Sequence, residues 1–245
     1  MAEFNIAHMY PDLMNLYGDR GNLVCLQHRL EWYGHSCTIK NISLGAKLEF
    51  DKIDMIFMGG GSDREQGLVY RDLLDKADNL LMEIRNGLPV LFICGAYQLL
   101  GKSYLSWDGS NMDGLGFFNF HTVGRKDRLI GNVLINSEVP GVSTSIVGFE
   151  NHGGRTYFDD PDLEPFGTVI KGYGNNGKDK TEGVLFKNLA GTYLHGPLLP
   201  KNPAISDWFI RTMAERKGIK INRVLDDTIE NFAHEQVKQK ILSSR

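Results

Sequence analysis

Short apolar runs alternate with longer amphipathic stretches along the first hundred residues. The runs are bounded by glycine, proline and polar residues, as strands usually are, whereas the longer stretches carry apolar positions at helical spacing. The pattern predicts strands at 4–9, 36–42, 54–58 and 89–93, and helices at 22–33, 64–86 and 95–100. Alternating strands and helices at this spacing form βαβ units, which predict a parallel sheet with helices on both faces.

The second half of the chain is richer in strands and turns. Strands are predicted at 131–135, 144–149, 168–172, 183–186 and 192–194, a glycine- and asparagine-rich hairpin or loop at 172–177, and helices at 204–217 and 227–242. No repeat, low-complexity tract or linker interrupts the pattern. We therefore predict one α/β domain over residues 1–245, with a mainly parallel central sheet, a strand-rich second half and a C-terminal helical extension from about residue 203.

Composition narrows the classes of function. The 245 residues carry 27 Lys and Arg against 30 Asp and Glu, a net charge of −3, which argues against a nucleic-acid partner. No apolar run approaches the ~20 residues of a membrane span, and the first residues lack the features of a signal peptide. The three cysteines follow neither a disulfide nor a metal-ligand pattern, so we expect no metal and a cytoplasmic protein.

Cys94 is the strongest candidate for a nucleophile. It follows the apolar strand at 89–93 and precedes a glycine and a helical segment, which is the strand–turn–helix geometry of a nucleophile elbow. The N-terminus of the next helix favours negative charge on the sulfur. The alternative is that Cys94 is a small buried apolar residue, as many unpaired cysteines are. Cys25 and Cys37 lack this setting and are expected to be structural.

A thiolate nucleophile needs an oxyanion hole and a base. The glycines at 59–61 end an earlier strand of the same sheet, so the N–H groups of Gly60 and Gly95 are the expected oxyanion donors, although such a glycine run is also typical of a plain tight turn. His195 follows a short strand and is the favoured base. His152 is its competitor among the seven histidines.

Several sequence blocks together resemble class I glutamine amidotransferases of the cobyric-acid-synthase type. More closely, they are similar to the glutaminase subunits of lipid II isoglutaminyl synthases. The resemblance runs over nearly the whole chain, and its blocks lie at 16–22, 59–66, 93–101, 148–157, 172–176 and 191–196.

The resemblance implies a reaction and a partner. Cys94 would attack the side-chain amide of L-glutamine, His195 would move the protons, and water would cleave the resulting thioester. The ammonia would pass to a MurT-like subunit of the Mur-ligase family, which would use ATP and Mg²⁺ to amidate the D-glutamate of lipid II. This chain carries no ATP-binding loop of the P-loop type, so we expect it to hold no cofactor and to form a heterodimer.

The resemblance also implies residues that bind the substrate. Arg128 is assigned to the α-carboxylate of glutamine, a group that a guanidinium binds with two hydrogen bonds. Gln98 is expected to line the pocket, with Asn151 and His152 as weaker candidates. Read without the family, Arg128 is one more solvated charge in the basic stretch at 125–128.

Three positions depart from the wider class. Many members have glycine two residues before and two residues after the nucleophile, where this chain has Phe92 and Ala96, and the third departure bears most on the mechanism. Where many members have a glutamate two residues after the catalytic histidine, this chain has Pro197. Two hypotheses follow: either Cys94 and His195 act without a third residue, or the partner subunit supplies a carboxylate to His195.

Other functions remain alternatives at this stage. They are a glutaminase for corrinoid amidation, a non-catalytic regulatory subunit with the same fold, and a thiol-dependent hydrolase acting on γ-glutamyl substrates.

Overall fold

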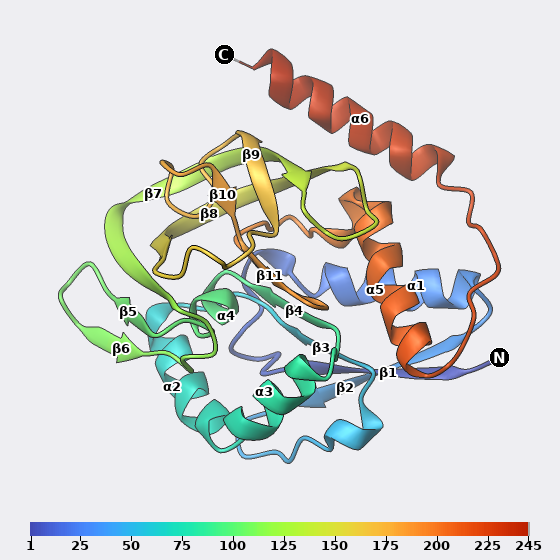
Figure 1. Ribbon diagram of the computed structural model, residues 1–245, viewed down its shortest axis with the longest axis horizontal. Helices are drawn as coiled ribbons and strands as arrows, with labels where there is room; N and C mark the ends of the chain where they lie inside the picture. The colour runs from blue at the N-terminus through green and yellow to red at the C-terminus, as the bar shows by residue number, and fades with distance from the viewer. Residues whose placement is uncertain (245) are drawn as a thin grey trace.

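The computed structural model describes residues 1–244 and is built on two sheets (Figure 1). The first sheet has the strand order β11-β12-β4-β3-β1-β2, and all of its strands are parallel except β11. The strands are β1 (Glu3–Met9), β2 (Ser36–Ile42), β3 (Met55–Met58), β4 (Val90–Ile93), β11 (Val184–Phe186) and β12 (Leu189–Thr192). Because the parallel strands run the same way, their carboxyl ends meet along one edge of the sheet.

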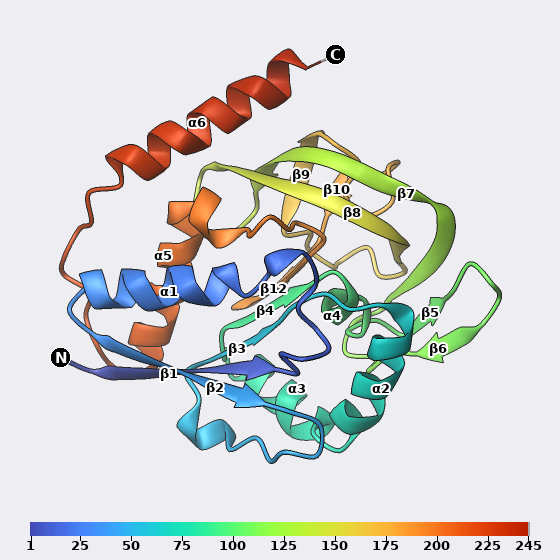
Figure 2. The ribbon, with the colours of Figure 1, turned by 180° about the vertical axis from the view of Figure 1, so that it is seen from behind.

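Helices cover both faces of the first sheet (Figures 1 and 2). Side chains alternate between the faces, so that in β4 Leu91 and Ile93 pack on one side while Val90 and Phe92 pack on the other. The first side is covered by α1 (Gly21–Trp32) and α5 (Pro203–Arg216), and the second by α2 (Asp63–Leu74) and α3 (Ala77–Arg85). The short helix α4 (Gly95–Gln98) follows β4 directly.

The second sheet lies against the carboxyl end of the first. It has the order β10-β9-β7-β5-β6, with β8 paired to β7. Its strands are β5 (Ser103–Leu105), β6 (Asn111–Asp113), β7 (Phe120–Ser137), β8 (Ser145–Phe158), β9 (Gly167–Lys171) and β10 (Thr181–Glu182). The last helix, α6 (Thr228–Ser243), crosses the outer side of this sheet, where Ile241 packs on Leu134 and Val147 (Figure 2). Three short 3₁₀ turns, Leu16–Gly18, Phe50–Lys52 and Leu199–Lys201, complete the elements.

The expected α/β architecture is confirmed, and several boundaries are corrected. The single helix expected at 64–86 is two helices, with a turn at Asp75 and Lys76 in which the Lys76 N–H bonds to the Leu73 carbonyl. The apolar spacing continues through the turn, which is why the pattern did not reveal it. The strands β5 and β6 were not expected, and β7 begins eleven residues before the strand predicted at 131–135.

No helix of the described residues is long and apolar enough to cross a membrane.

Candidate active site

Cys94 lies at a strained turn between β4 and α4. Its backbone has φ 53° and ψ −106°, a left-handed conformation that a residue other than glycine rarely adopts. Its N–H donates to the Thr192 carbonyl at 2.8 Å, which ties the turn to the neighbouring strand β12. The expected elbow is present, and Cys94 lies at the edge where the parallel strands end.

His195 lies three residues after the end of the adjacent strand β12 and is fully buried. Its backbone exchanges two hydrogen bonds with Phe149 of β8, of 2.8 and 3.2 Å, so the residue joins the two sheets. Burial alone would lower the pKa of the ring, but a hydrogen bond with Asp19 and the neighbouring sulfur of Cys94 raise it to about 10. The ring is therefore protonated at neutral pH in this environment.

Asp19 is a candidate site residue that the sequence analysis missed. Its Oδ1 lies 2.9 Å from His195 Nδ1, and both side chains are fully buried. It follows β1 in the loop that leads into α1, and Asn22 of that helix donates a hydrogen bond to its carbonyl at 2.9 Å. Because β1 neighbours β3 in the sheet, this loop reaches the same edge as Cys94 and His195.

This contact corrects the account of the third residue. The expectation was either a dyad without an acid or a carboxylate from the partner subunit; instead, the carboxylate at His195 Nδ1 belongs to this chain. Pro197, which stands at the position of the usual glutamate, packs against Gly21 at the start of α1, since a Cβ on Gly21 would lie 2.6 Å from Pro197 Cγ. The carboxylate of Asp19 therefore comes from the loop before α1, and Pro197 packs on the first residue of that helix.

The three side chains converge around Gly60. A Cβ atom built at this position would lie 3.2 Å from Cys94 Cβ and 3.3 Å from His195 Cε1. It would lie 3.7 Å from Asp19 Oδ2. Only glycine, which has no side chain, leaves room here for Cys94, His195 and Asp19 to lie this close to the backbone.

The N–H of Gly60, one of the two expected oxyanion donors, already has a hydrogen-bond partner in this structure. The Gly60 N–H donates to Asp19 Oδ2 at 3.1 Å, because this buried carboxylate needs a second donor besides His195. Among the described residues, no hydrogen bond engages the N–H of the next glycine, Gly61, which lines the active-site pocket. Gly95, the other expected donor, is the first residue of α4. The N–H groups in the first turn of a helix have no partner within that helix, so the N–H of Gly95 can bind a ligand.

The pocket beside Cys94 has a volume of about 440 Å³. It is lined by Cys94 at the turn after β4 and Gln98 of α4, and by Arg128 and His152 from the second sheet. The structure therefore brings the expected substrate-binding residues to one cavity with the nucleophile.

Arg128 lies at an irregular part of β7, between Gly124 and Leu129, where the register with β8 shifts. Its Nε donates to Asn151 Oδ1 at 2.6 Å, and its Nη2 donates to the Asn151 carbonyl at 2.5 Å. Nη2 also lies 3.4 Å from the hydroxyl of Tyr17, whose ring packs edge-on against His195. These contacts aim the guanidinium along the pocket while leaving it exposed to solvent.

Two further expected residues are buried in the pocket wall. Gln98 donates from Nε2 to the Tyr193 hydroxyl at 3.1 Å. His152 stacks on Tyr193 with ring centroids 3.7 Å apart. Burial, together with the nearby charges of arginines and of His195, lowers the pKa of His152 to about 3, so it is neutral and a far weaker base than His195. In the part of the chain that the structure describes, no cluster of side chains is arranged to hold a metal ion.

Comparison with known proteins gives a consistent picture. Residues 5–203 match the family model of the CobB/CobQ-like glutamine amidotransferase domain. A lipid II isoglutaminyl synthase (glutamine-hydrolyzing) subunit GatD from Staphylococcus aureus is 44% identical over 99% of this chain and 96% of its own length. The subunit of the same name from Streptococcus pneumoniae is 38% identical over 88% of this chain and 82% of its own.

A solved structure has a similar fold. A glutamine amidotransferase from Thermotoga maritima superposes with a TM-score of 0.54 at 14% identity, over 98% of this chain and 99% of that one.

Proposed function

Because this chain belongs to the CobB/CobQ-like family of glutamine amidotransferases, we propose that it is the glutamine-hydrolysing subunit of an enzyme that amidates lipid II. The observation that carries the chemistry is the convergence of Cys94, His195 and Asp19 at Gly60, beside a pocket that contains Arg128. The two relatives named GatD support lipid II as the acceptor of the ammonia, because each matches this chain over more than four-fifths of its own length.

The first step is attack by Cys94 on the side-chain amide carbon of L-glutamine. His195 holds the proton that leaves the thiol, since its raised pKa keeps the ring protonated at neutral pH. His195 then gives this proton to the departing nitrogen, ammonia leaves, and a γ-glutamyl thioester remains on Cys94. Asp19 fixes the tautomer of His195 and offsets its positive charge throughout.

Water completes the reaction. The neutral ring of His195 takes a proton from water, hydroxide adds to the thioester carbonyl, and the thiolate leaves with glutamate as the product. In both steps the negative oxygen would be held by the N–H groups of Gly95 and Gly61, since that of Gly60 is already bonded to Asp19.

Substrate binding uses the opposite wall of the pocket. Arg128 would exchange part of its contact with Asn151 for the α-carboxylate of glutamine, a stronger, charge-assisted partner. Gln98 would contact the substrate from the first turn after the nucleophile.

The partner would be a MurT-like subunit of the Mur-ligase family. It would bind ATP, Mg²⁺ and lipid II, and it would use the released ammonia to convert D-glutamate to D-isoglutamine. The requirement for ATP supports a second chain, since this one has no P-loop sequence.

A glutaminase assay tests the proposal. The chain alone should release glutamate and ammonia from L-glutamine, and adding a Mur-ligase-family partner with ATP and lipid II should couple the ammonia to amidated lipid II. Hydrolysis by neither preparation would favour the non-catalytic regulatory subunit. Coupling to a corrinoid acceptor instead of lipid II would favour the corrinoid alternative.

A further inference from the structure

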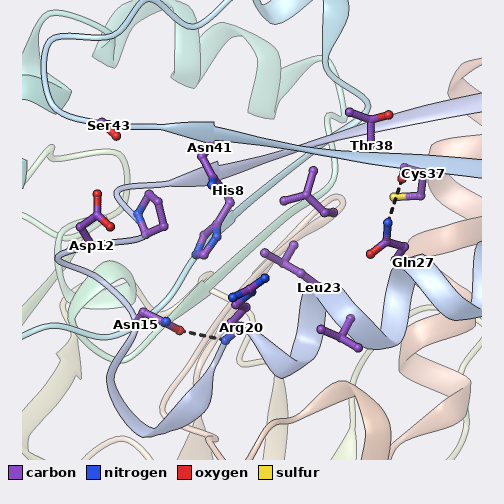
Figure 3. A pocket seen from close by; sticks show the side chains of 13 residues that line it. His8, Asp12, Asn15, Arg20, Leu23, Gln27, Cys37, Thr38, Asn41 and Ser43 are labelled. Atoms are coloured by element: carbon purple, nitrogen blue, oxygen red, sulfur yellow. Dashed lines mark hydrogen bonds between the residues drawn. The ribbon is translucent and has the colours of Figure 1, made fainter.

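A second cavity of the molecule is separate from the active site. It measures about 690 Å³ and lies between α1 and the strands β1 and β2 at the edge of the first sheet (Figure 3). Side chains with polar groups make up most of its lining: His8, Asp12, Asn15, Arg20, Gln27, Thr38, Asn41 and Ser43. Most of these polar side chains also reach solvent, so the cavity is an open groove whose lining suits a polar ligand.

Two opposite charges line this cavity without being paired. Arg20 and Asp12 both lie on its wall, and neither forms a salt bridge within the described residues. Both charges act on the ring of His8, which extends from β1 toward Arg20 (Figure 3). A simple anion would suit Arg20 but be repelled by Asp12, whereas a zwitterion would satisfy both.

The floor of the cavity carries an unsatisfied polar atom. His8 is 2% exposed, and its Nε2 has no hydrogen-bond partner within the described residues. Burial, aided by the charge of Arg20 and opposed by the charge of Asp12 and the polar side chain of Asn41, lowers the pKa of His8 to about 4, so the ring is neutral. Buried polar atoms are normally bonded, so this one points to an occupant.

One loop separates this cavity from the active site. Asn15 and Arg20 line the cavity, and the Asn15 side chain accepts a hydrogen bond from the Arg20 N–H at 3.0 Å. Leu16 and Tyr17, between them, line the active-site pocket. Asp19, which holds His195, directly precedes Arg20. A ligand that drew Arg20 into the cavity would therefore pull on the carboxylate that orients the catalytic histidine.

We propose that this cavity is a second binding site, for a zwitterionic amino acid with a polar side chain, and that its occupancy lowers catalysis through the loop at 15–20. Arg20 would bind the carboxylate, Asp12 the ammonium group, and His8 Nε2 the polar end of the side chain. The effect on catalysis rests on the proposed glutaminase function, but binding does not.

Binding is tested with L-glutamate as the probe, followed by the NMR signals of the His8 ring. We expect a saturable shift in the full chain, and an affinity at least about tenfold weaker in Arg20→Gln and in Asp12→Asn, each of which removes one charged contact from an exposed position. Glutarate, which lacks the ammonium group, and L-norvaline, which lacks the polar end, should bind more weakly. Arg128→Ala should leave the shift intact. No shift, or the same affinity in both charge variants, would overturn the proposal.

The link to catalysis is tested by glutamine hydrolysis at increasing L-glutamate. Product bound in the active site competes with glutamine and leaves kcat unchanged, whereas occupancy of the second cavity should lower kcat severalfold at saturating glutamine. Arg20→Gln should keep the competitive effect and lose the effect on kcat. Binding at His8 with no change in kcat would overturn the link. If the chain hydrolysed no glutamine, the His8 titration would still decide the binding site, so the two proposals fail separately.

Discussion

The two walls of the active-site pocket are built very differently. On the first wall, Cys94, His195 and Asp19 come from the ends of parallel strands and the loop after β1, and the latter two are fully buried. On the second wall, Arg128 lies on an irregular, exposed part of β7 and is held mainly by Asn151. The side chains proposed to carry out catalysis are thus fixed in place, while the side chain proposed to bind the substrate is free to exchange its hydrogen-bond partners.

This difference has a physical reason. A base must keep one tautomer and one distance to its nucleophile, which burial and several hydrogen bonds secure. A residue that binds a carboxylate must release its resting contacts when the substrate arrives, which is easier at an exposed site. Substitutions on the first wall should therefore act on kcat, and those on the second wall on KM.

The largest effect is expected at the nucleophile. Cys94→Ser should lower glutamine hydrolysis at least about 10⁴-fold, because a serine hydroxyl is a poor nucleophile in a site arranged for sulfur, and His195→Ala should be similarly severe. The fold should persist in both. Cys25→Ser is the matched control, since that thiol lies outside the active-site pocket and contacts Ser206. Substantial turnover by the Cys94 variant would exclude it as the nucleophile.

The next effect is expected at the acid. Asp19→Asn keeps the size of the side chain but removes the charge that holds His195, so kcat should fall about 10²–10³-fold with little change in KM. Asp51→Asn, an exposed carboxylate elsewhere in the chain, should have no effect. A variant at Asp19 with normal kcat would contradict its role in positioning the base.

A smaller effect, of a different kind, is expected on the second wall. Arg128→Ala should raise the KM for glutamine about 10–100-fold through loss of a charge-assisted contact, with kcat changed far less. Arg128→Lys should restore little, because lysine cannot form the paired contact. Lys126→Ala, on the same part of β7, is the control. Unchanged kinetics in both Arg128 variants would show that Arg128 is an ordinary surface charge that does not bind the substrate.

The smallest effect on activity is expected at His152. Its neutral ring lines the pocket and stacks on Tyr193, so His152→Ala should lower kcat less than about tenfold and destabilise the fold by about 1–3 kcal/mol. Thermal unfolding and steady-state kinetics would check both. A loss as large as that of His195→Ala would mean that the base has been misassigned.

The sequence predicted most of the first sheet, since its strands are short apolar runs and its helices are amphipathic. It also placed Cys94 and His195 correctly at strand ends. Two features could not be predicted from the spacing of apolar residues. The turn at Asp75 leaves the helical spacing of apolar residues intact, and the irregular part of β7 around Arg128 is polar and exposed.

Asp19 was missed for a different reason. The third residue was sought next to His195 in sequence, at Pro197, whereas it lies 176 positions earlier in the chain. The available signal was topological: an acidic residue between two glycines follows β1, and the ends of neighbouring parallel strands meet at one edge. The hydrogen bond from the Gly60 N–H to Asp19 could not be predicted either, because the sequence does not show that the two residues lie together.

The central claim is that one chain holds the nucleophile, the base and the acid together. Its most direct test is an NMR titration of the His195 ring in the isolated chain, without any partner, alongside Asp19→Asn. We predict a pKa of about 10 in the unmodified chain, because Asp19 and Cys94 favour the charged ring, and a clearly lower pKa in the variant. A His195 pKa that is the same in both proteins, or that rises only when a partner subunit is added, would contradict the account.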